Sequence, residues 1–111
     1  MPTRLELLRG FIAQRPADPF PRYGLAMEYK NAGQLQDAWE TFRMLISEHP
    51  DYVAAYLHAG ATLMALGLTD EARAVYQEGV AACGRTGDAH ARGELEAALA
   101  ALPAAGDGGA A

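Results

Sequence analysis

Apolar residues recur three and four positions apart along most of the chain, the spacing that places side chains on one face of an α-helix. The spacing predicts helices over about residues 21–31, 35–48, 53–66, 70–82 and 88–102. Val and Ile, which favour strands, are scarce, whereas Ala and Leu are plentiful. The pattern therefore predicts an all-α fold. The apolar stripes are Leu25, Ala26 and Tyr29; Ala38, Phe42, Leu45 and Ile46; Ala59, Gly60 and Leu63; Ala72, Tyr76, Gly79 and Val80; and Leu95, Ala98, Leu99 and Leu102.

Turn-forming residues separate these stripes and predict where the helices begin and end. Gly33 and Gly67 each follow a stripe, as glycine does just beyond a helix end. Asp18 and Asp51 precede predicted helices, and their carboxylates suit the free N–H groups of a first turn. Thr69 precedes two acidic residues and is expected to be an N-cap.

The chain matches itself when it is shifted by 34 residues. Pro16, Pro50 and Gly84 keep this spacing, and each is expected to end a helix. Each period contains two predicted helices separated by a glycine. Equivalent positions include Asp37 and Glu71, Ala38 and Ala72, and Phe42 and Tyr76.

Small residues occupy matching positions in the two units. Two antiparallel helices approach closely only where side chains are short, so Ala26 or Gly60 on a first helix is expected to meet Ala38 or Ala72 on the second. A bulky residue at either alanine would separate the pair and cost roughly 1–3 kcal/mol by overpacking.

Together, the period, the paired small residues, the aromatic on the second helix and the closing proline resemble the tetratricopeptide repeat. The resemblance implies a superhelix of about six helices, right-handed and built from antiparallel pairs. It covers residues 19–52 and 53–86 as two repeats, within a single domain spanning 1–102. Residues 4–18 resemble the second half of an earlier repeat, with the stripe Leu5, Leu8, Phe11 and Ile12. The chain departs from the family at Arg22, Leu45, Gly79 and Gly84.

Two segments follow the repeats. Residues 87–102 read as a final amphipathic helix that caps the open apolar end of the stack. The alternative is a mobile helix that covers the binding groove until a partner displaces it. Residues 103–111 have too little apolar bulk to pack and are expected to be disordered.

Charge and cysteine content narrow the function classes. The net charge of −5 argues against nucleic acid as the main partner. Residues 1–30 hold five basic and three acidic side chains, so this segment carries +2 and the remainder −7. Cys83 is the only cysteine, so an internal disulfide is excluded and a reducing compartment is expected. The sequence has neither an apolar run of about 18 residues nor a signal-peptide pattern, so we expect no membrane span and a cytoplasmic location.

The sequence offers no catalytic constellation. His49, His58 and His90 stand apart, and neither a zinc motif nor a glycine-rich phosphate loop is present. His58 is expected to be a surface histidine, and Cys83 an inert thiol. We therefore predict that the chain is not an enzyme and needs neither a cofactor nor a metal.

The resemblance implies a binding groove lined by the first helix of each repeat. Spacing of three and four separates these groove positions from the stripes that pack each repeat. Apolar, methionine-bearing grooves suit amphipathic helices or apolar peptides. For Leu57 and Ala61, packing against the chain's own flanking helices is an equal alternative. The expected groove residues are Phe20, Tyr23, Met27, Lys30, Asn31, Leu57, Ala61 and Met64.

These positions lack the Lys, Asn and Arg set with which relatives of this type clamp a carboxyl-terminal peptide. The predicted function is therefore a protein–protein interaction module, or adaptor, that binds a peptide or an amphipathic helix. The alternative is a self-assembling structural protein or assembly factor that forms a homodimer or larger oligomer.

Overall fold

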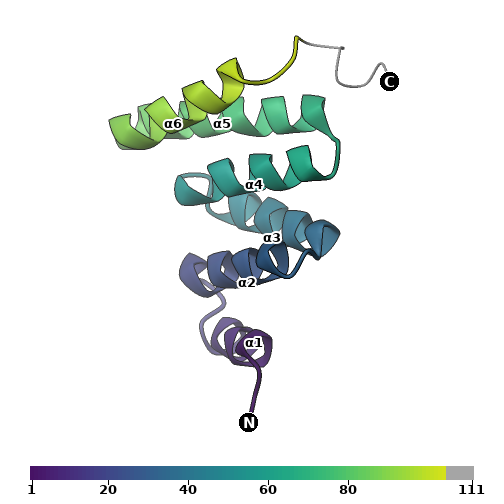
Figure 1. Cartoon of the computed structure of the whole chain (residues 1–111). Coiled ribbons are helices and arrows are strands. Elements are labelled where there is room, and N and C mark those ends of the chain that lie inside the picture. The colour runs from purple at the N-terminus through teal and green to yellow at the C-terminus, as the bar shows by residue number, and fades with distance from the viewer. Residues whose placement is uncertain (105–111) are drawn as a thin grey trace.

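The computed structural model describes residues 1–104, and these residues form six helices and no strand. Successive helices run back and forth and stack in a row from α1 to α6 (Figure 1). The predicted all-α, repeat-like architecture is therefore confirmed. The predicted tail lies, from residue 105 onward, outside the described residues. The helices are α1 (Arg4–Gln14), α2 (Pro19–Asn31), α3 (Leu35–Glu48), α4 (Ala54–Ala65), α5 (Thr69–Thr86) and α6 (Ala89–Ala100).

Short polar side chains cap three of the helices. The Thr3 hydroxyl accepts a bond from the Glu6 N–H at 3.1 Å, and the Asp18 carboxylate accepts one from the Phe20 N–H at 3.0 Å. Asp88 caps α6 by accepting from the Ala91 N–H at 2.9 Å. The prediction for Asp18 is confirmed, and Pro19 follows it at the first helical position, where no N–H is needed.

Two other predicted starts are wrong. Leu68 is the N-cap of α5, so Thr69 already lies inside the helix and its side chain makes no cap bond. Val53 is the N-cap of α4, and Asp51 instead accepts a bond from the Arg85 guanidinium at 2.8 Å. Helix α5 begins two residues after the left-handed Gly67, just as α3 begins two residues after Gly33.

Gly33 and Gly67 end α2 and α4 with φ of +79° at both positions, as predicted. In this left-handed region only glycine is free of steric cost. Gly84 does not end α5, so that prediction is wrong. The helix runs through Gly84 to Thr86 and stops at Gly87, which has φ of +77° and donates its N–H to the Cys83 carbonyl at 2.8 Å.

The core depends on close approach between small and large residues. Ala26, Ala38 and Ala72 are fully buried. A Cβ placed on Gly60 would lie 2.1 Å from Cε1 of Tyr76, so the closest neighbour of Gly60 is this ring and not Ala72. In the second repeat, α4 and α5 are therefore joined by an aromatic ring placed against a residue without a side chain.

Helix α1 packs against α2 through only part of its predicted stripe. Leu8 is buried, and Leu5 and Ile12 are half-buried. Phe11, expected on the same stripe, is 51% exposed, and Leu7 beside it is 48% exposed. The described residues include no helix that covers this flank of α1, which explains the departure from the prediction.

Candidate partner-binding surface

The accessible side chains of α4 fall on one face of the helix. Its other side chains are buried against α3 and α5, because the helix lies in the middle of the stack. The accessible face is almost entirely apolar, and it includes the groove positions of α4 that the sequence suggested. These side chains are Ala54, Leu57, His58, Ala61, Met64 and Ala65.

The groove positions suggested on α2 differ in exposure. Phe20, at the start of the helix, is 68% exposed, and Asn31, at its end, is also exposed. Tyr23, Met27 and Lys30 are half-buried. Since α2 contacts α4, the accessible faces of the two helices are neighbours, and we call this combined surface the α2–α4 face.

Tyr23 lies in an aromatic cluster that joins the two repeats. Its ring centroid is 5.5 Å from that of Tyr52, 6.0 Å from that of His58 and 6.5 Å from that of Phe42. Burial raises the pKa of Tyr23, and burial, followed by the charges of Tyr23 and Asp18, raises the pKa of Tyr52. Tyr23 therefore packs the inter-repeat contact as well as reaching the α2–α4 face.

His58 is half-buried in this cluster rather than a freely exposed surface histidine, which corrects the sequence expectation. Burial lowers its pKa, and the nearby Lys30 lowers it further, whereas Glu94 of α6 acts in the opposite direction. The net effect favours the neutral form of the imidazole. Lys30 and Glu94 thus place opposite charges on either side of the central helix, a feature that sequence spacing did not reveal.

Helix α6 packs along α5 and touches α4 at the end of the stack, in the position expected of a cap (Figure 1). Leu95 is 1% exposed, and its Cδ1 lies 2.9 Å from the place that a Cβ on Gly79 would occupy. Leu99 is half-buried against the same core. Next to α6, Arg73 donates a hydrogen bond to the Pro103 carbonyl, which fixes the chain just after the helix.

The remaining candidate chemistry is structural. Cys83 is 2% exposed, and burial raises the pKa of its thiol, so the reactive thiolate is disfavoured. Residues 1–104 hold no group of three His, Cys, Asp or Glu side chains placed to bind a metal ion. None of the helices in this range combines the length and apolar character needed to cross a bilayer.

Comparison with known proteins places this geometry in a family. Residues 31–83 match the tetratricopeptide repeat, and no curated protein matches the sequence. A tetratricopeptide repeat domain protein from Salinibacter ruber, solved in solution, is similar with 34% identity and a TM-score of 0.72 over 77% of this chain and 86% of that one. The crystal structure of a Salinibacter ruber protein of this type gives 34% identity and a TM-score of 0.71, over 75% of this chain and 93% of that one.

A protein from Bordetella parapertussis has 28% identity and a TM-score of 0.76, over 90% of this chain and 87% of that one. The similarity therefore extends well beyond the two central repeats. The chain belongs to the tetratricopeptide repeat family.

Proposed function

We propose that this chain is an adaptor that binds an apolar peptide or an amphipathic helix on its α2–α4 face. Tetratricopeptide repeats generally mediate protein–protein interaction. The observation that carries the proposal is the accessible face of α4, which is apolar except for His58 although the core stripe of the helix is already buried. A partner that covered this face would remove it from water.

The side chains of the face suit such a partner. Met27 and Met64 are flexible and can adjust to the shape of a bound helix. Leu57 and Ala61, four residues apart on the accessible face of α4, form the central strip of this surface. Lys30, at the carboxyl end of α2, supplies a cation beside the apolar strip. The proposed recognition is non-catalytic, needs no cofactor or metal, and takes place in the cytoplasm, a location that the lone buried thiol supports.

The test should change the α2–α4 face while leaving the aromatic cluster around Tyr23 intact, and circular dichroism should confirm that each variant remains folded. Replacing Tyr23 would also damage the aromatic cluster, so we choose Met27→Ala together with Ala61→Gln, which adds bulk to the central strip. Met44→Ala is the matched control, because Met44 is 52% exposed on α3 and away from this face. Partner capture from the native cell extract should be lost in the double variant and kept in the control. Equal capture by all three proteins contradicts the proposal.

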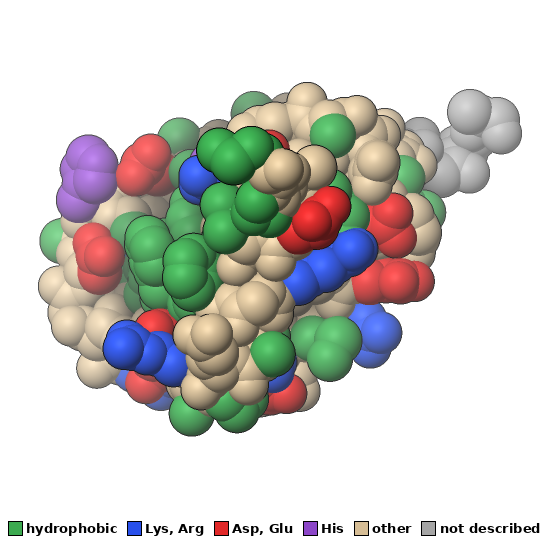
Figure 2. All heavy atoms as spheres, turned by 90° about the horizontal axis from the view of Figure 1, so that it is seen from below, with side chains coloured by type: hydrophobic (Ala, Val, Ile, Leu, Met, Phe, Trp, Pro, Cys, Tyr) green, Lys and Arg blue, Asp and Glu red, His purple; other side chains and the backbone are tan. Residues whose placement is uncertain are grey.

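Self-association is the second candidate function, and one observation favours it. Hydrophobic side chains reach the surface at the α1 end of the molecule (Figure 2), where Leu7 and Phe11 are half exposed. Sedimentation equilibrium tests this candidate directly. A mass that rises with concentration supports it, and a concentration-independent monomer rejects it.

A further inference from the structure

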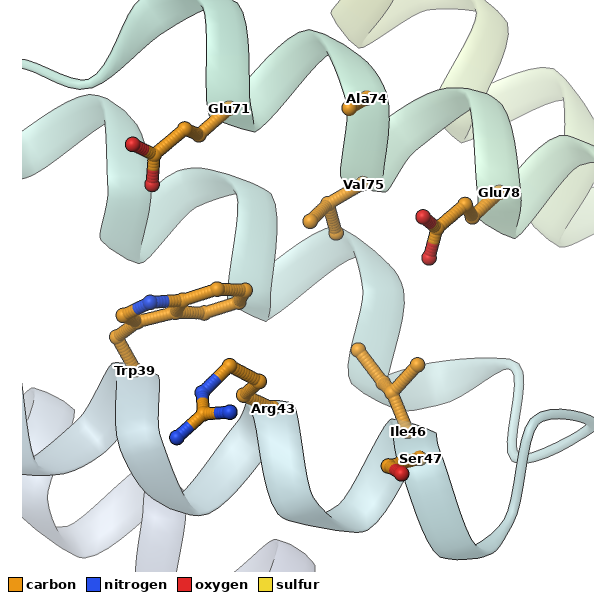
Figure 3. Close-up of a pocket in the computed structure, with 8 residues that line it drawn as sticks. All are labelled: Trp39, Arg43, Ile46, Ser47, Glu71, Ala74, Val75 and Glu78. Carbon is orange, nitrogen blue, oxygen red and sulfur yellow. The ribbon is translucent and has the colours of Figure 1, made fainter.

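A groove runs between α3 and α5, the second helices of the two repeats, and is distinct from the α2–α4 face. Its main cavity has a volume of about 390 Å³ (Figure 3). A second cavity of about 360 Å³ shares Ile46, Ser47 and Glu78 with it and continues to Arg85. The groove therefore follows α5 for four turns, about 21 Å at 1.5 Å per residue. The main cavity is lined by Trp39, Arg43, Ile46, Ser47, Glu71, Ala74, Val75 and Glu78.

The groove combines an apolar floor with charged walls. Trp39 and Ile46 of α3 face Ala74 and Val75 of α5 across the gap (Figure 3). On the α5 wall, the carboxylates of Glu71 and Glu78 point toward the gap from either side of Val75. These two glutamates are seven residues apart, or about 10.5 Å along the helix.

Three charges of this groove are unused inside the chain. Glu71 and Glu78 form no ion pair within residues 1–104, and neither does Arg43 on the opposite wall. The groove could therefore hold an amphipathic helix that brings cations to its α5 wall and an anion to its α3 wall.

Helix α1 of the same chain has this pattern on its uncovered flank. Leu7 and Phe11 are four residues apart and form its apolar centre. Arg15, the C-cap residue of α1, follows Phe11 by four positions, and Glu6 directly precedes Leu7; neither forms an ion pair within the described residues. Beside the stripe, a Cβ on Gly10 would meet nothing within 4 Å, so no contact inside the chain requires glycine in this helix.

We infer that the uncovered flank of α1 of one copy docks in the α3–α5 groove of a second copy. Leu7 and Phe11 then cover the apolar floor, Arg15 approaches the glutamate wall, and Glu6 approaches Arg43. Gly10 allows the two backbones to come close. The charge distribution agrees, because residues 1–30 carry +2 and the remainder carries −7.

This inference rests on the second candidate function, self-association, and specifies its surfaces. The contact is heterologous, since the two surfaces that meet are different parts of the chain. Copies can therefore add head to tail. A variant that lacks only one of the two surfaces should still join a variant that lacks only the other.

The experiment uses two single-surface variants of the full chain. Phe11→Asp disrupts the apolar flank of α1, and Ala74→Glu fills the α3–α5 groove. Both positions are exposed, so the variants should fold, and circular dichroism checks that they do. Each variant alone should remain monomeric in sedimentation equilibrium at protein concentrations up to about 1 mM, which is a typical dissociation constant for a weak interface. An equimolar mixture should form one-to-one dimers, because the intact α1 flank of the Ala74→Glu variant can dock in the intact groove of the Phe11→Asp variant.

A charge test and a fluorescence test accompany the mixing experiment. Glu71→Lys with Glu78→Lys should weaken self-association about tenfold or more. Glu94→Lys with Glu96→Lys on α6 makes the same change in net charge outside the groove, although it also removes the pairs with His90 and Arg92, and it should leave self-association unaltered. Trp39, the sole tryptophan, should shift its emission to shorter wavelength as wild-type protein associates.

Three results would overturn the inference. A wild-type monomer at all concentrations removes the self-association on which it rests. If the Ala74→Glu variant and the Glu71→Lys, Glu78→Lys variant still associate as wild type does, self-association remains a function of the chain, but α1 does not dock in the α3–α5 groove. A mixture of the two single-surface variants that remains monomeric shows that the two surfaces do not meet each other.

Discussion

Replacing Gly60 with alanine tests the close approach of α4 and α5. The added Cβ would lie 2.1, 2.5 and 2.6 Å from three ring carbons of Tyr76, whereas carbon atoms in good contact are about 3.5–4.0 Å apart. Tyr76 is 5% exposed and has little room to move, so the helices must separate. We expect overpacking to lower the free energy of unfolding by about 3 kcal/mol, and the better helix propensity of alanine to offset about 1 kcal/mol of this loss.

The net loss of about 2 kcal/mol corresponds to a fall in melting temperature of about 8–16 °C for a domain of this size. Thermal unfolding followed by circular dichroism measures it. Gly93→Ala is the matched control, because a Cβ at that helical position meets nothing within 4 Å, and it should raise the melting temperature. In a Tyr76→Leu background, Gly60→Ala should lose most of its cost. A Gly60→Ala variant as stable as Gly93→Ala would refute the packing argument.

Three further predictions follow from buried side chains. The pKa of His58 is lower in the folded protein than its usual value, so its contribution to stability is complete above about pH 6.5 and is lost as the pH falls through the folded pKa. The melting temperature of wild type should therefore fall more than that of His58→Gln when the pH is lowered from about 7.5 to 5.5, and equal falls would contradict this assignment. Cys83 should react with iodoacetamide at about pH 8 far more slowly in the folded protein than in urea, since its thiol is buried with a raised pKa; equal rates would contradict its burial. Leu95→Ala should cost about 3 kcal/mol and increase amide exchange in α6, because Leu95 fills the space above Gly79; unchanged exchange would mean that α6 is held by other contacts.

The 34-residue period predicted most of the fold, because each helix pair repeats the same local pattern. The bounds of α3, Leu35–Glu48, agree with the prediction. The start of α5 is set by the turn that precedes it. Each second helix begins two residues after a left-handed glycine, so Gln34 and Leu68 are equivalent N-caps and Thr69 is one residue too late. Gly84 sits at the family's proline position, but glycine is compatible with helix, and α5 continues to the next glycine, Gly87.

Periodicity also separated the accessible face of α4 from its core stripe, since both properties belong to a single helix. It could not reveal that His58 packs on Tyr23, because that contact depends on the angle between two repeats. The groove between α3 and α5 was missed for the same reason. Trp39 and Val75 belong to different repeats, and no pattern within one helix shows that they face each other.

Protein binding at the α2–α4 face can be tested directly inside the cell. The most direct measurement is photo-crosslinking in the native cell from a photoreactive amino acid placed at Met64, compared with one placed at Met44 on α3. We expect the photoreactive residue at position 64 to crosslink a defined protein, and we expect this product to disappear when Met27→Ala and Ala61→Gln are introduced. Crosslinks that form equally from Met44, or that persist in the double variant, would contradict it.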